Sequence, residues 1–131
     1  MLRLICLLII ILAASCQQDP KLFNKISSEA SNITFQNTIS NTSQLNILNY
    51  LYFYNGAGVA AGDFNNDGLA DLYFVANQNQ DKLYLNKGNL EFEDVSNRAN
   101  LLNENNWTTG VTTVDINNDG LLDLYICLVG A

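Results

Sequence analysis

The chain has 131 residues and a formal net charge of −7, from 6 basic and 13 acidic side chains. This acidity argues against a protein that binds nucleic acid by neutralising its phosphates, and a hydrophobic content of 48% argues against a disordered chain. Six of the thirteen acids fall in two short loops, Asp63–Asp71 and Asp115–Asp123, so their placement is more informative than their number.

Residues 1–16 predict a signal peptide. One basic residue precedes an apolar run that ends at Leu12, and small residues then lead to Cys16. A run that short is typical of an export signal rather than of a membrane span. Small residues followed by cysteine resemble the bacterial lipobox, whose cysteine is lipidated. We therefore expect an exported bacterial lipoprotein of the outer membrane or cell surface, attached only through lipid on Cys16. The alternative is ordinary signal cleavage near Ala14 or Ser15, with Cys16 incidental.

Residues 17–44 predict a polar tether that includes one possible strand. Ser, Asn and Thr predominate, and Ile33–Ile39 (ITFQNTI) has the composition of a short strand. From Leu45 the chain becomes rich in aromatic and β-branched residues and is interrupted by glycines. Leu45–Phe64 therefore predicts a strand, a tight turn and a second strand.

Two segments of the chain are near copies of each other. Gly58–Val75 reads GVAAGDFNNDGLADLYFV and Gly110–Cys127 reads GVTTVDINNDGLLDLYIC, with eleven of eighteen positions identical at a spacing of 52 residues. This spacing is too long for a single hairpin and is close to that of a four-stranded propeller blade. The predicted strands of one repeat are Gly58–Phe64, Asp71–Asn77, Lys82–Asn86 and Leu90–Val95.

The sequence also predicts how the repeats are delimited. The third and fourth strands form a hairpin with its turn at Lys87–Asn89, and Asn97–Asn106 connects to the second repeat with room for one helical turn. We expect a first blade over residues 45–106 and a second over residues 107–131, which is incomplete because only two of its strands are present.

Each repeat contains one loop with the pattern D-x-N-x-D-G-x-x-D. In a tight loop the side chains at positions one, three, five and nine converge, together with the carbonyl of position seven, and the glycine at position six permits the sharp turn. Oxygen donors with several carboxylates suit Ca²⁺ before Mg²⁺. The expected ligands are Asp63, Asn65, Asp67, the Leu69 carbonyl and Asp71 in the first loop, and Asp115, Asn117, Asp119, the Leu121 carbonyl and Asp123 in the second.

These loops differ from EF-hands. Position twelve, where a bidentate glutamate belongs, holds Phe74 in one copy and Ile126 in the other, and strand sequence follows instead of a helix. Dockerin and thrombospondin type 3 repeats also fit poorly, because the former need helices and the latter need cysteines between closely packed loops. The simplest alternative is an ordinary turn with solvated acids, which the duplication of every ligand position disfavours.

Over Asn55–Ala131 the chain resembles the FG-GAP/VCBS repeats of integrin-α-like β-propellers. Within that group it is most similar to bacterial cartilage-acidic-protein-like lipoproteins of the ASPIC/UnbV type. The residues that carry the resemblance are YNGAGVAAGDFNNDGLADLYFVAN, DKLYLNKGNLEFEDVS and WTTGVTTVDINNDGLLDLYICLVG. The resemblance implies an all-β fold, the first one to two blades of a propeller of about seven blades, truncated in the second. It also implies that each calcium loop joins the first and second strands of its blade.

These features predict a calcium-binding cell-surface module for adhesion or for binding a protein or a glycan. The alternatives are the propeller scaffold of a polysaccharide-processing enzyme or accessory protein, and a purely structural repeat. We expect no catalysis from this segment, because the sequence has no histidine and no G-x-S-x-G motif. The loop carboxylates are better explained as metal ligands than as an acid and base pair.

Aromatic side chains form the remaining notable feature. Their faces suit carbohydrate stacking, but such residues more often pack within or between blades, and we favour packing. Cys127, the one thiol left after export and lipidation, is expected to be a small buried hydrophobic residue with no disulfide partner. The aromatic residues concerned are Tyr50, Tyr52, Phe53, Tyr54 and Trp107.

Overall fold

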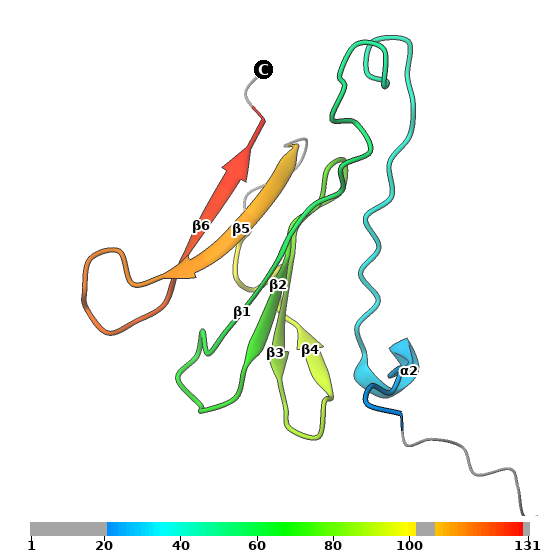
Figure 1. The fold of residues 1–131 in the computed structure, drawn as a ribbon. Helices are drawn as coiled ribbons and strands as arrows, with labels where there is room; N and C mark the ends of the chain where they lie inside the picture. Colours follow the sequence, from blue (N-terminus) through cyan, green and yellow to red (C-terminus); the bar gives the residue numbers. More distant parts are fainter. Residues whose placement is uncertain (1–20, 102–106, 130–131) are drawn as a thin grey trace, which may run out of the picture.

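The computed structural model of the protein describes residues 21–101 and 107–129. Its strands form two antiparallel sheets, which confirms the all-β prediction (Figure 1). Among the described residues the helical content is one short element, α2, and no helix there is long and apolar enough to cross a membrane. The bounds are α2 Ser28–Ser31, β1 Val59–Gly62, β2 Asp71–Phe74, β3 Lys82–Asn86, β4 Phe92–Asp94, β5 Thr108–Val114 and β6 Asp123–Leu128.

The first sheet contains the four strands that the repeat predicts. They lie in the order β1-β2-β3-β4, each antiparallel to the next, whereas β5 and β6 form a two-stranded sheet. The turn at Lys87–Asn89 joins β3 to β4, as expected, and Gly88 and Asn89 there have positive φ angles of 88° and 54°. The signal peptide, Cys16 and residues 102–106 of the connection lie outside the described residues.

The hydrophobic core lies between the two sheets. Along β2 the side chains alternate between faces, and Tyr73 points towards the second sheet, where it packs with Ala60 and with Val111, Leu124 and other partly buried residues. Its hydroxyl donates to Oδ2 of Asp81 at 3.2 Å. Burial, followed by the charge and hydrogen bond of Asp81, raises the pKa of Tyr73 above its ordinary value.

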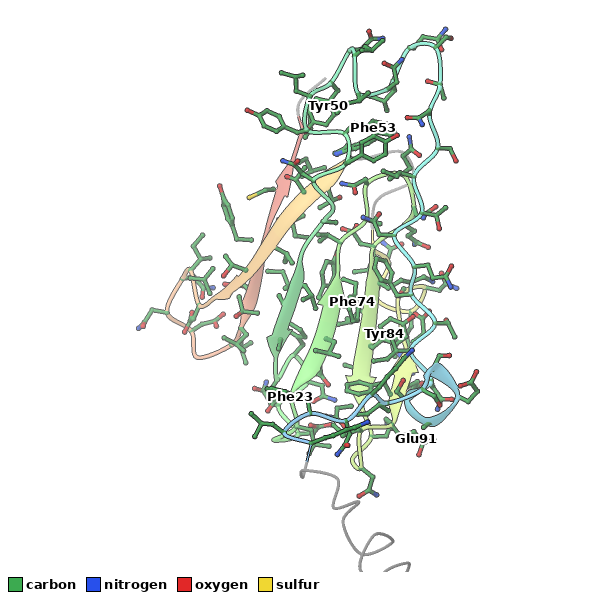
Figure 2. All side chains as sticks on the ribbon, turned by 45° about the vertical axis from the view of Figure 1, so that its right-hand side comes forward. Phe23, Tyr50, Phe53, Phe74, Tyr84 and Glu91 are labelled. Carbon is green, nitrogen blue, oxygen red and sulfur yellow. The ribbon has the colours of Figure 1, made fainter. Side chains whose placement is uncertain are left out.

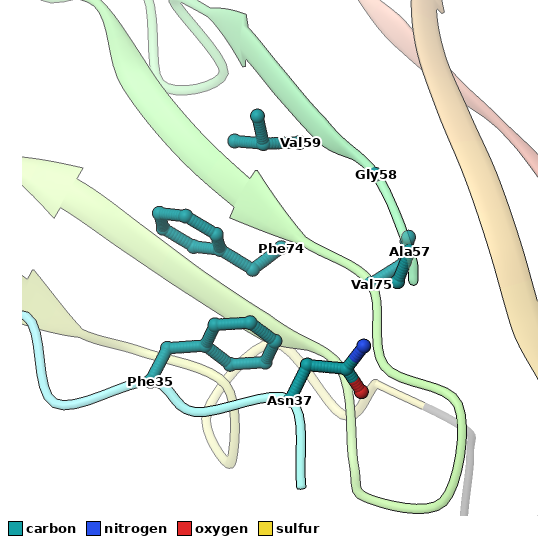
Figure 3. A pocket seen from close by; sticks show the side chains of 7 residues that line it. All are labelled: Phe35, Asn37, Ala57, Gly58, Val59, Phe74 and Val75. Carbon is teal, nitrogen blue, oxygen red and sulfur yellow. The ribbon is translucent and has the colours of Figure 1, made fainter. Parts of the chain in front are cut away.

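The opposite face of the first sheet is covered by the chain that precedes it. Tyr84 meets Phe74 edge to face with ring centroids 5.8 Å apart (Figure 2). Phe35 stacks on Phe74 with ring centroids 4.9 Å apart. Tyr84 is fully buried in this way, although its hydroxyl has no hydrogen-bond partner among the described residues. An apolar pocket of about 230 Å³ remains beside these rings (Figure 3), lined by Phe35, Asn37, Ala57, Gly58, Val59, Phe74 and Val75.

Two strand predictions in this preceding chain are wrong. Ile33–Ile39 runs beside the first sheet but is not a strand, because amide side chains hold it: Asn79 donates to the carbonyls of Gln36 and Thr38. Residues 45–54 form successive turns instead of a strand. There the Asn46 carboxamide accepts from the backbone of Leu48, which is the kind of local bond that competes with sheet formation.

The second sheet is covered on one face. Val111 and Ile126 are partners in register and face the first sheet, whereas the next pair along, Thr112 and Tyr125, faces away. Cys127 is exposed. The prediction that Cys127 is buried is therefore wrong, because no described segment packs on the outer face of this sheet.

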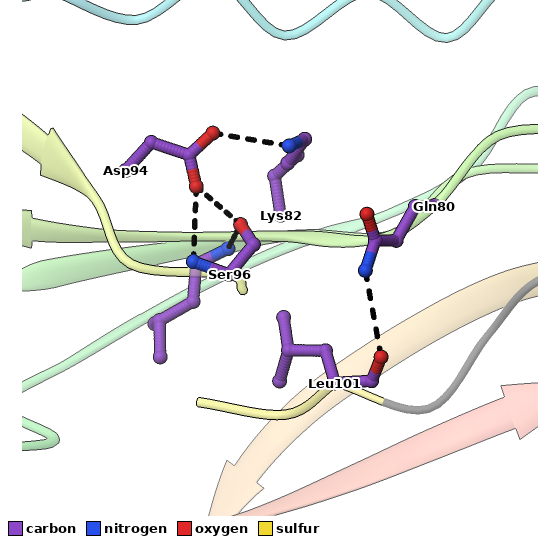
Figure 4. A network of polar contacts seen from close by, with 6 residues as sticks. Gln80, Lys82, Asp94, Ser96 and Leu101 are labelled. Atoms are coloured by element: carbon purple, nitrogen blue, oxygen red, sulfur yellow. Dashed lines mark hydrogen bonds and ion pairs between the residues drawn. The ribbon is translucent and has the colours of Figure 1, made fainter. Parts of the chain in front are cut away.

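The first sheet ends in a polar turn after β4 (Figure 4). Asp94 accepts hydrogen bonds from the backbone and the hydroxyl of Ser96 and pairs with Nζ of Lys82 at 3.1 Å. Burial disfavours the charged form of Asp94, but these partners outweigh it and hold the pKa of the carboxyl below its usual value. Gln80 then donates to the carbonyl of Leu101 and ties the chain that leaves this turn.

Strands β1 and β5 pack directly against each other, and glycine permits this approach. A Cβ atom at Gly58 would lie 3.2 Å from Cα of Gly110 and 3.2 Å from the backbone nitrogen of Val111. Both are main-chain atoms, which cannot move aside as the end of a side chain can. A Cβ at Gly110 would meet only Cβ of Cys127, at the ordinary distance of 3.9 Å.

We therefore expect Gly58→Ala to destabilise the protein by about 1–3 kcal/mol, because the added methyl group forces the two sheets apart. The matched control, Gly110→Ala, adds the same group and should change the free energy of unfolding by less than about 0.5 kcal/mol. Urea unfolding of the two variants and the wild type measures the difference. Equal stability of the two variants would contradict this account of the contact between β1 and β5.

Candidate metal centre

The two acidic loops connect equivalent strands at the same end of the two sheets. The first joins β1 to β2 and the second joins β5 to β6 (Figure 1). Gly68 and Gly120, at position six, have φ angles of 84° and 86°, and Asn66 and Asn118, at position four, both have 59°. The tight turn predicted from the glycine is thus present in both copies, at angles that disfavour a side chain with a Cβ.

In the first loop, carboxylates bond to backbone amides of the loop itself. Asp63 Oδ1 accepts from the amide of Asp67 at 3.0 Å, and its Oδ2 accepts from the amide of Gly68 at 2.8 Å. Asp67 Oδ1 accepts from the amide of Leu69 at 2.9 Å, and its Oδ2 accepts from the Asn65 side chain at 2.8 Å. These bonds bring the residues at positions one, three and five together.

The second loop repeats the same bonds. Asp115 accepts from the amides of Asp119 and Gly120 at 3.0 and 2.9 Å, and the Asn117 side chain donates to Asp119 Oδ2 at 2.9 Å. Asp119 Oδ1 accepts from the amide of Leu121 at 2.8 Å. The Leu121 amide, followed by the Asn117 side chain, holds the pKa of the exposed Asp119 carboxyl below its usual value.

The acid at position nine has a different environment. Asp71 is fully buried, and its Oδ2 accepts from the amide of Phe64 at 2.9 Å while its Oδ1 accepts from the amide of Asn86 at 2.8 Å. Both oxygens of Asp71 therefore fix the ends of the loop to the sheet. In the second loop, Asp123 Oδ2 accepts from the amide of Ile116 at 3.0 Å, the equivalent of the Phe64 bond.

The structure thus divides the predicted ligands into two sets. Positions one, three and five share a hydrogen-bonded cluster, whereas position nine is bonded to backbone amides, and among the described residues no group of three His, Cys, Asp or Glu side chains is placed to hold a metal ion. The donors present are carboxylate and amide oxygens, which are the type that Ca²⁺ uses. The leucines at position seven bond through their amides to the acid at position five.

Sequence reasoning missed Asn86 and Asn77. Asn86 closes the first loop, because its side chain also donates to the carbonyl of Ala70 at 2.9 Å. Its position at the end of the third strand, antiparallel to the start of the second, is the signal that could have identified it. Asn77 has no comparable signal, although its side chain donates to the carbonyls of Gly56 and Thr108, at 3.0 Å each.

Comparison with known protein families found one match. Residues 63–126, just under half of the chain, match the model of an FG-GAP-like repeat. The match begins at the first acid of the first loop and ends within β6, so it includes both loops and the sheet between them. Searches of curated proteins and of solved structures found no significant match. Together with the two antiparallel sheets, the repeat identifies the architecture as part of an all-β propeller.

Asp71 should stabilise the fold without any metal. We expect Asp71→Ala, measured in a chelator, to lower the free energy of unfolding by on the order of 3 kcal/mol, because two amides lose a charged acceptor at a buried site. Asp123→Ala removes the equivalent side chain of the second loop, which accepts from one exposed amide. This variant should therefore lower the free energy of unfolding by less than about 1 kcal/mol. Urea unfolding without calcium gives both values, and equal losses would contradict the assignment.

Proposed function

We propose that each acidic loop binds one Ca²⁺ ion, which braces the connection between the first two strands of its blade. The observation that carries the proposal is the duplicated bonding of position one, where Asp63 and Asp115 each hold the amides of positions five and six. The oxygens expected to hold the ion are those predicted from the pattern. The ion would supply positive charge to the loop.

The charges around the loops support this proposal. Neither loop contains a basic residue, and the ion pairs within the described residues lie elsewhere, between Lys82, Lys87 or Arg98 and the acids Asp94 or Glu93. Three carboxylates per loop are therefore left without a cationic side chain as partner. A divalent cation would relieve their mutual repulsion, and an affinity of about 10⁻⁴–10⁻³ M is typical of such extracellular sites.

We also propose a biological setting for these loops, namely a lipoprotein that binds another macromolecule at a bacterial surface. The lipobox-like sequence that ends at Cys16 supports export and anchoring, and the match to a propeller-type repeat supports a binding module. In this setting calcium stiffens the blades, and the ligand binds elsewhere on them.

Calcium should raise the melting temperature of the protein. At a calcium concentration about 100 times Kd, one occupied site adds about 2.7 kcal/mol to the free energy of unfolding. This corresponds to a rise of roughly 10 °C in the melting temperature of a domain of this size. Asp115→Ala should remove about half of the calcium-induced shift, because it removes the position-one ligand of one of the two loops. Thermal denaturation followed by circular dichroism, with calcium and then with excess chelator, measures the change.

Glu93→Gln is the matched control for this experiment. It also removes one negative charge, but from a surface residue that pairs with Lys87 and Arg98 outside the loops. Its calcium response should equal that of the wild type. A wild-type melting curve that is the same with calcium and with chelator would refute calcium binding.

Lipidation makes a separate prediction. In a bacterium grown with radiolabelled palmitate, the wild-type protein should carry label and sediment with membranes, whereas Cys16→Ser should be unlabelled and soluble. Cys127→Ser is the control, because it removes the other thiol of the exported protein and should keep the label. Label retained by Cys16→Ser would show that Cys16 is not the attachment site.

A further inference from the structure

The end of the sheets opposite the acidic loops carries a second pocket. It lies where the chain enters β1 and β5 and leaves β6, close to Tyr50 at the upper end of the molecule in Figure 2. Its volume is about 290 Å³, at the small end of the range for ligand pockets. The lining residues are Tyr50, Tyr52, Asn55, Gly56, Thr109 and Val129.

The aromatic side chains at this end have two different roles. Phe53 is fully buried, and its ring lies 5.3 Å from that of Trp107, which in turn meets Tyr50 edge to face at 5.5 Å. These rings support the wall of the pocket. Tyr52 meets Tyr50 at 5.9 Å but remains 62% exposed. The expectation that these residues serve only packing therefore fits Phe53 and not Tyr52.

Among the described residues, the segments that line the pocket contain no charged side chain. Neither residues 30–62, which include the turns before β1, nor residues 107–114 and 124–129 contain an Asp, Glu, Lys or Arg. The polar groups offered here are amides and hydroxyls. In a chain of net charge −7, such a surface suits a neutral ligand that is rich in hydrogen-bonding groups, and it gives a charged partner no counter-ion.

Hydrogen-bonding groups in the pocket are available to such a ligand. Within the described residues, no hydrogen bond engages the carboxamide of Asn55 or the hydroxyls of Tyr50 and Tyr52. Thr109 donates its hydroxyl to the carbonyl of Cys127 at 3.3 Å, so its oxygen still has lone pairs that can accept. An exposed ring beside unengaged amide and hydroxyl groups combines an apolar face with directional polar contacts.

We propose that this pocket binds one residue of a neutral glycan. The C–H face of the sugar ring would lie on Tyr52, and its hydroxyl groups would exchange hydrogen bonds with Asn55 and Thr109. The proposal rests on the surface-binding function proposed above and names the class of its ligand. A pocket of this volume accommodates a single sugar unit, so a polymer would bind through one exposed unit at a time.

Affinity electrophoresis tests the proposal with the purified full chain. The gels contain a neutral β-glucan, a neutral mannan, a neutral galactan or the anionic polygalacturonate. We expect at least one neutral gel to retard the protein, with retardation unchanged when sodium chloride is raised to about 0.5 M, because no charges are paired. Tyr52→Ala should weaken this binding roughly tenfold.

Tyr54→Ala is the matched control. Tyr54 is a neighbouring tyrosine that is 59% exposed, but it does not line the pocket, and its hydroxyl bonds with the Asn41 side chain at 3.0 and 3.2 Å. This variant should be retarded like the wild type. Retardation in no neutral gel, retardation only by polygalacturonate, or equal weakening by the two tyrosine variants would each overturn the proposal.

The calcium experiment remains separable from this one. The pocket and the acidic loops lie at opposite ends of the sheets, so the melting curves report on the loops and the gels report on the pocket (Figure 1). A calcium-dependent melting curve with no retardation in any neutral gel would refute glycan binding and leave calcium binding supported. If Tyr52→Ala abolishes the retardation but calcium does not change the melting curves, calcium binding would be refuted and glycan binding would stand.

Discussion

One buried side-chain amide, that of Asn77, links the chain segments at which the two sheets begin. Its nitrogen donates to the carbonyls of Gly56, just before β1, and Thr108, at the start of β5, while its oxygen accepts from Asn37 at 2.7 Å. Asn77 is 2% exposed, and its removal would leave the buried carbonyl of Thr108 without this donor. Three segments distant in sequence are thereby held at one point, from which β1 and β5 run side by side.

This arrangement separates the molecule into two ends of different chemistry. Because β1 and β5 start together and pack along their length, the loops that follow them lie at one common end and the chain that precedes them at the other. The acids of Asp63–Asp71 and Asp115–Asp123 gather at the first end, and the uncharged aromatic chain around Tyr50 gathers at the second. The lack of side chains at Gly58 and Gly110 lets the two sheets approach closely near the starts of β1 and β5.

The structural elements that could be predicted from the sequence are those that leave a periodic or repeated pattern in it. Alternation and duplication located all four strands of the first sheet and both loops, but the turns of residues 45–54 and the course of Ile33–Ile39 depend on amide side chains that bond to nearby or distant backbone. Such bonds leave no repeating pattern. The bond from the amide of Asn86 to Asp71 was also missed, because it depends on how the third strand pairs with the second in the folded sheet. The prediction that Cys127 is buried was wrong because this residue lies on the outer face of the second sheet, which no described segment covers.

Tyr73 and Tyr125 occupy the same place in the two repeats, yet Tyr73 is 1% exposed and Tyr125 is 57% exposed. The pKa of Tyr73 is raised by its burial and by the carboxylate of Asp81 beside it. Its hydroxyl can therefore lose its proton readily only when the sheets part and water enters. Ionisation of Tyr73 at high pH is therefore coupled to separation of the two sheets, so within the absorbance of the six tyrosines its contribution alone reports that separation.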